Sequence, residues 1–110
     1  MAPSERIAAE LAAGRQAQQA GNPGRARVCA RRAAGLGIKA WYQRRGDAAW
    51  SGDAMRQLAR LQADPLAPAE VRAAAARLTT KVDFDHQLPF DDDPLVDAER
   101  ILAWLEAPSP

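Results

Sequence analysis

The feature that most constrains the fold is a stretch from Pro23 to Gln43 in which small side chains recur at helical spacing. Asn22 offers a side-chain acceptor just before Pro23, whose missing N–H costs nothing in the first turn of a helix. The recurring stripe consists of Ala26, Cys29, Ala30, Ala33, Ala34, Gly37 and Trp41. Because small residues let a neighbouring helix approach closely, the stripe predicts a central helix packed against others.

Larger apolar residues lie on the other sides of the same stretch. They are Val28, Leu36, Ile38 and Tyr42. A helix that is apolar on several sides is usually central in its domain. Gly35 and Gly37 each cost a helix about 1 kcal/mol relative to alanine, so either close packing requires them or the helix breaks there.

Four further helices follow from apolar periodicity and capping residues. The first is expected to begin after Ser4, its N-cap, and to end at about Ala20. The others are expected from about Asp53 to Ala63, from near Pro68 to near Lys81, and from Pro94, capped by Asp93, to Leu105. The segment Val82 to Pro94 has two prolines and no helical period, so it is predicted to be an ordered loop crossing the body. The sequence therefore predicts a single all-α domain over residues 1–110, with about five helices in an up-and-down bundle.

Composition narrows the function classes. The single cysteine cannot form an internal disulfide, and no charged-then-apolar leader opens the chain. No apolar run approaches the length of about 20 residues that a transmembrane helix needs. We therefore expect a cytoplasmic protein that does not span a membrane.

Charge is distributed unevenly along the chain. Residues 1–81 carry 14 Lys and Arg against 6 Asp and Glu, whereas residues 82–110 carry 1 against 8. The basic residues of the central helix and its exit are Arg25, Arg27, Arg31, Arg32, Lys39, Arg44 and Arg45. A basic helix can bind phosphates, and the candidates for nucleotide or nucleic-acid binding are Arg27, Arg31, Arg44 and Arg45. However, the charges spread around the helix without interleaved aromatic residues, which favours a solvated surface or pairing with the acidic C-terminal part.

Three stretches together resemble the HEPN family of small prokaryotic helical-bundle proteins. They are the Gly21-Asn22-Pro23 turn with the basic, Ala-rich helix after it, the amphipathic pair from Asp53 to Leu78, and the acidic loop around His86 with the closing helix Asp97 to Leu105. The resemblance implies an HEPN-like bundle, a homodimer, and a nucleotidyltransferase partner of the kind found in toxin–antitoxin pairs. It also implies RNA or nucleotide as a ligand.

Many HEPN proteins are metal-independent ribonucleases that carry an arginine and a histidine with four to six residues between them. That motif is absent here, because Arg77 lies too far before His86 and the nearest match is Lys81, with four residues between it and His86. Lysine lacks the planar, bidentate fork of arginine. The residues therefore favour a non-catalytic binding module over a divergent ribonuclease that would use His86 with Lys81 or Arg77 at a dimer interface. A TPR-like adaptor is a weaker alternative, since no repeat of about 34 residues is found.

The remaining candidate sites have simpler explanations. His86 is the only histidine, so a site built on two histidines cannot form within one chain, and no metal or cofactor is predicted. The aspartates Asp91 to Asp93 could attract a hard cation, but carboxylates at a helix start also complement the helix dipole, which is the favoured interpretation. Cys29 lies on the small-residue stripe and is expected to be a buried hydrophobe. Trp41, Trp50 and Trp104 are expected to be core or interface anchors.

Overall fold

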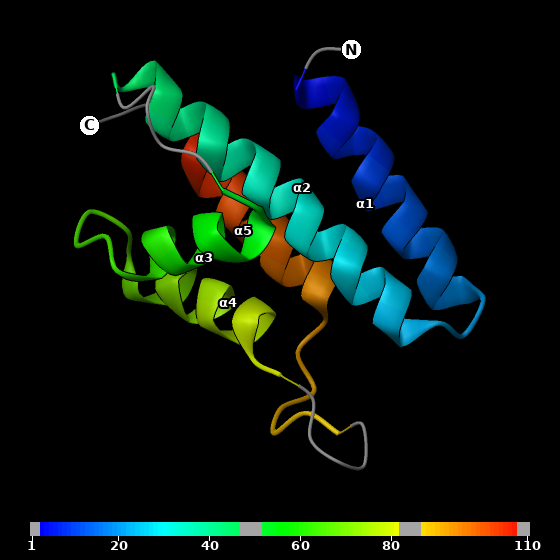
Figure 1. Cartoon of the computed structure of the whole chain (residues 1–110). Helices are drawn as coiled ribbons and strands as arrows, with labels where there is room; N and C mark the ends of the chain where they lie inside the picture. Colours follow the sequence, from blue (N-terminus) through cyan, green and yellow to red (C-terminus); the bar gives the residue numbers. More distant parts are fainter. Residues whose placement is uncertain (1–2, 47–51, 82–86, 108–110) are drawn as a thin grey trace.

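The computed structural model describes residues 3–46, 52–81 and 87–107, and within these ranges the chain forms five helices and no strand (Figure 1). The helices are α1 (Pro3–Gln19), α2 (Pro23–Arg44), α3 (Ala54–Gln62), α4 (Ala69–Thr79) and α5 (Pro94–Glu106). The predicted all-α fold is confirmed. The central helix is continuous through Gly35 and Gly37, so the alternative of a break at these residues is wrong.

Polar residues cap three of the helices: Asn22 and Asp93 as predicted, and Asp53, which was predicted as the first residue of its helix. The side chains of Asn22, Asp53 and Asp93 each accept a hydrogen bond from a backbone N–H of the following first turn, at 3.1, 3.0 and 2.8 Å. Two other predicted boundaries differ. Ser4 lies inside α1 instead of capping it, and Pro68 is the residue before α4 instead of its first helical residue.

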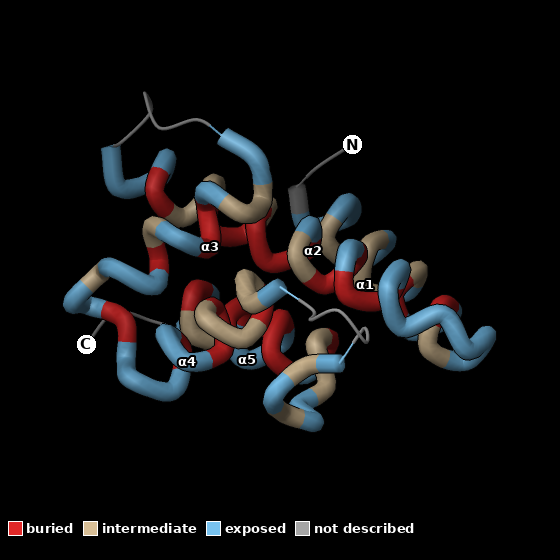
Figure 2. Tube along the Cα trace, turned by 60° about the horizontal axis from the view of Figure 1, so that its bottom comes forward, coloured by how far each residue is buried: buried red, intermediate tan, exposed pale blue. Residues whose placement is uncertain are grey.

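Helix α2 lies at the centre of the molecule and contacts all four other helices. With α1 it forms a hairpin across the short turn at Gly21, while α5 lies along another side and the α3–α4 pair covers a third (Figure 1). The small-residue stripe is buried, as predicted, from Ala26 to Gly37. In Figure 2 the buried red segments gather where the helices face one another, and the exposed pale blue segments lie on the outside.

Aliphatic residues from α3, α4 and α5 complete the core against the stripe. The fully buried ones are Leu58, Leu61, Val71, Leu78, Leu95 and Ile101. Trp41 and Trp104 are half-buried, and their rings lie 5.3 Å apart against the core. Trp50 lies outside the described residues. None of the described helices is both long and apolar enough to span a bilayer.

Candidate functional site

The three residues of the ribonuclease hypothesis do not share one set of surroundings. His86 lies outside the described residues, and Lys81 is exposed just beyond α4. Arg77 forms a bidentate ion pair with the buried carboxylate of Asp97, at 2.9 Å from Nε to Oδ2 and 2.7 Å from Nη2 to Oδ1. These hydrogen bonds raise the pKa of Arg77. The Nε and Nη2 groups of Arg77 therefore already donate to the Asp97 carboxylate of α5.

Two of the predicted phosphate-binding arginines contact the end of α4. Arg27 is buried and donates from Nη2 to the carbonyls of Arg77 and Thr80, the latter at 2.7 Å. Arg31 donates from Nε to the carbonyl of Leu78 at 2.6 Å. The last carbonyls of a helix have no intrahelical partner, and cations there complement the helix dipole. Both side chains thus fasten α4 to α2, and burial lowers the pKa of each.

The other two predicted arginines lie at the exposed end of α2. Arg44 is the last residue of the helix, and the Arg45 guanidinium lies 4.4 Å from the centre of the Trp41 ring. That contact is a cation–π interaction, which stabilises an exposed site by about 0.5–1 kcal/mol. The structure therefore does not bring Arg27, Arg31, Arg44 and Arg45 together as one phosphate-binding site.

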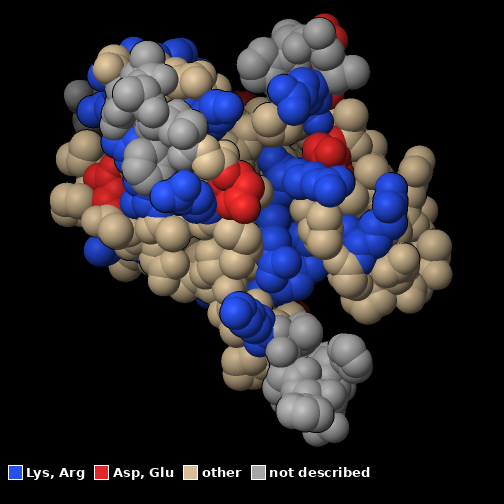
Figure 3. Space-filling model, in the orientation of Figure 1, with Lys and Arg blue, Asp and Glu red and all other residues tan. Residues whose placement is uncertain are grey.

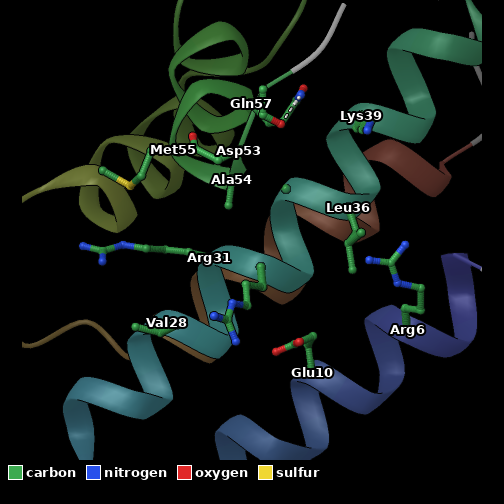
Figure 4. Close-up of a pocket in the computed structure, with 13 residues that line it drawn as sticks. Arg6, Glu10, Val28, Arg31, Leu36, Lys39, Asp53, Ala54, Met55 and Gln57 are labelled. Carbon is green, nitrogen blue, oxygen red and sulfur yellow. Dashed lines mark hydrogen bonds between the residues drawn. The ribbon is translucent and has the colours of Figure 1, made fainter.

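A different group of cations does come together, in a groove of about 580 Å³ between α1, α2 and α3. Figure 4 shows Arg6 and Glu10 from α1 on one side, Met55 from α3 and its capping residue Asp53 on the other, and α2 between them. The α2 residues that line the groove are Val28, Arg31, Arg32, Gly35, Leu36 and Lys39. Of these, only Arg31 was among the predicted site residues.

The groove exists because α1 and α3 both contact α2 but, in the described part of the chain, do not contact each other. Close packing at Gly35 positions the α3 wall. A Cβ added at Gly35 would lie 2.8 Å from Cα and 2.9 Å from Cβ of Ala54, distances that real Cβ atoms essentially never show. Helix α3 therefore begins directly against α2, and the adjoining face of α2 stays open.

Three cations of the groove have no ionic partner. Among the described residues, Arg6, Arg32 and Lys39 form neither an ion pair nor a side-chain hydrogen bond, whereas the carboxylate of Asp53 is already used as the cap of α3. The described part of the lining holds four cations, Arg6, Arg31, Arg32 and Lys39, and two carboxylates, Glu10 and Asp53. Figure 3 shows basic side chains gathered along this hollow. A concave surface with an excess of one charge concentrates partners of the opposite charge.

The acidic C-terminal part neutralises cations elsewhere in the molecule. Arg15 pairs with Glu99, and Arg77 pairs with both Asp97 and Asp92. The pairing was predicted for the basic residues of α2 and its exit, whereas these ion pairs involve Arg15 of α1 and Arg77 of α4. Among the described residues, none beyond Gln57 lines the groove.

Cys29 is buried behind the groove, as predicted from its place on the stripe. Burial raises the pKa of its thiol, and the nearby Glu10 carboxylate raises it further, against smaller opposite effects of Arg25 and Arg32. Less thiolate is then present at pH 8 than for an ordinary cysteine, and thiolate is the reactive form.

We expect Ellman's reagent to modify Cys29 in the native protein far more slowly than in the protein in denaturant. Complete modification of the native protein on mixing would contradict this assignment.

The groove brings together residues that the sequence separates widely. Arg6 and Met55 come from helices flanking α2, and nothing in their own sequence neighbourhoods marks them as site residues. The available signal is the spacing of Val28, Arg32, Leu36 and Lys39, which fall on one side of a helix away from the small-residue stripe.

Comparison with known proteins does not assign the chain to a family. No protein-family model, curated protein sequence or solved structure matches it.

Proposed function

We propose that the protein is a non-catalytic binding module that takes an acidic segment of a partner protein into the groove between α1, α2 and α3. One observation carries the proposal: this groove holds Arg6, Arg32 and Lys39 without ionic partners among the described residues, although acidic residues neutralise arginines elsewhere in the chain. Unpaired cations in a concave site increase both the rate and the strength of binding to an anionic partner.

The chemistry of the lining favours a protein segment over a nucleic acid. Single-stranded nucleic acids are usually held by aromatic side chains on which bases stack, and among the described residues that line the groove none is aromatic. Instead it combines the cations with Val28, Leu36 and Met55. Apolar groups flanked by charges are typical of surfaces that bind amphipathic peptides.

The HEPN relationship, the homodimer and the nucleotidyltransferase partner stay predictions. They are compatible with a module that acts through a protein partner. In the ribonuclease alternative, Arg77 could take part only by leaving its ion pair with the buried Asp97, whereas Lys81 is exposed. Cleavage of RNA by the wild type that His86→Ala abolishes would favour that alternative over the proposal.

Charge reversal in the groove tests the proposal. We expect the double variant Arg32→Glu/Lys39→Glu to bind fluorescein-labelled poly-L-glutamate at least about tenfold more weakly than the wild type at low ionic strength. Exposed ion pairs contribute about 0.2–1 kcal/mol each, and reversal replaces two attractions by two repulsions. Fluorescence anisotropy measures the affinities, and added salt should weaken binding to the wild type.

The matched control is Arg25→Glu/Arg72→Glu, which changes the net charge equally at two exposed arginines outside the groove. It should retain most of the wild-type affinity. Equal losses in the two double variants would show binding to net charge alone and would overturn the proposal. Tighter binding of single-stranded RNA than of poly-L-glutamate at the same ionic strength, lost on reversal in the groove, would favour the nucleic-acid alternative.

A further inference from the structure

One face of α2 has no neighbouring helix within the described ranges of the chain. Val28, Arg32, Leu36 and Lys39 are separated by four, four and three residues, so they form a single row along the helix. Helices α1 and α3 stand on either side of this row without touching each other. From Val28 to Lys39 the row is about 16 Å long, which is the length of about three helical turns.

The row and its walls present two kinds of chemistry. Val28 is 39% exposed, and Leu36 and Met55 are half-buried, so apolar surface is accessible within the groove. Arg6 and Arg32 are exposed, and Lys39 is half-buried; none has an ionic partner in the described part of the chain. An occupant that satisfies both must bring apolar groups to α2 and carboxylates to the cations.

The geometry points to an acidic amphipathic helix of about three turns as the occupant of this groove. Its apolar residues, spaced three and four apart, contact Val28, Leu36 and Met55, and its carboxylates lie beside Arg6, Arg32 and Lys39. The inference rests on the proposed function, since it specifies the structure of the acidic segment. Charge complementarity favours an acidic partner. The row of accessible apolar side chains along α2 favours a helical segment over an irregular acidic chain.

The experiment compares two hydrocarbon-stapled peptides of identical composition, each about fifteen residues long, or about four turns. In one, leucines recur every third or fourth position between glutamates; in the other, the leucines are spread around the helix. Each is titrated into the protein by fluorescence anisotropy, beside poly-L-glutamate. We expect the amphipathic peptide to bind at least tenfold more tightly than its isomer.

Two matched variants separate apolar contact from charge. Val28→Ser removes accessible apolar surface in the groove, whereas Val96→Ser makes the same change on α5 at a valine that is 44% exposed and outside the groove. Val28→Ser should weaken binding of the amphipathic peptide about tenfold, because roughly two buried methyl groups are lost, and Val96→Ser should not. Neither change should alter binding of poly-L-glutamate.

The outcomes distinguish this inference from the proposed function. Equal binding of the two peptides, or no difference between Val28→Ser and Val96→Ser, would overturn the helical occupant while leaving an acidic ligand in place. Loss of groove-dependent binding for every acidic probe would overturn the proposed function itself. Self-association of the protein by light scattering, abolished by Arg32→Glu/Lys39→Glu, would instead identify a second copy of this chain as the occupant.

Discussion

Replacing Arg77 with methionine is expected to lower the free energy of unfolding by about 3 kcal/mol, the lower end of the range for breaking a buried ion pair. The reason is Asp97, which is 2% exposed and would keep its charge without its bidentate partner. Arg100 still reaches Asp97 at 3.4 Å, which holds the loss near the lower end. Urea denaturation measures the loss.

The control for this prediction is Arg15→Met, which breaks the ion pair with Glu99. Both partners of that pair are nearly half exposed. Exposed ion pairs contribute at most about 1 kcal/mol, so the control variant should lose far less stability than Arg77→Met. The double variant Arg77→Met/Asp97→Leu should regain much of the loss, because it removes the buried charge. Equal losses for Arg77→Met and Arg15→Met would contradict the structural role of the Arg77–Asp97 pair.

Replacing Gly35 with valine is expected to destabilise the protein by about 2–3 kcal/mol, the upper part of the range for overpacking. Valine is a slightly better helix former than glycine, but that gain is only a few tenths of a kcal/mol. Against it stands the contact with Ala54, where the nearest atom is backbone Cα, so no rotamer change can relieve the clash. Helix α3 must then move away from α2, and the wall of the groove moves with it. Thermal unfolding and poly-L-glutamate binding together report both effects.

Gly24→Val in the same helix provides the comparison. The nearest atom to an added Cβ at Gly24 is Oδ1 of Asn22 at 3.9 Å, so the side chain enters open space. Its stability should change by less than about 0.5 kcal/mol, as for an ordinary surface substitution. If Gly35→Val were as stable as Gly24→Val, close approach of α3 to α2 would not define the groove.

Local signals in the sequence were sufficient to predict the helices. Asn22 and Asp93 cap helices where they were expected to, because a capping side chain and the turn it serves are close in sequence. The small-residue stripe also identified α2 as the central helix. The residues of such a stripe are close in sequence, because the helical period determines which of them share a face. The boundary at Ser4 was wrong, because that serine lies within a helix that begins at Pro3.

The candidate site depended on contacts between helices and was largely missed. Arg27 and Arg31 suggested phosphate binding, but they bind the last carbonyls of α4, some fifty residues later in the chain. Periodicity within one helix cannot show that the end of another helix lies beside it. The groove likewise depends on α1 and α3 flanking α2, so only tertiary structure shows that Arg6 lies near Arg32.

The most direct test of the central claim, that this groove is the binding site, is a methyl-resolved NMR titration of the wild-type protein with poly-L-glutamate. The structure predicts shifts of the Val28, Leu36 and Met55 methyl signals at low ionic strength, with the Val96 and Leu66 signals unchanged. Val96 and Leu66 are exposed apolar residues outside the groove, so they report non-specific binding. Shifts confined to the groove would support the account; shifts of Val96 and Leu66 without those of the groove methyls would contradict it.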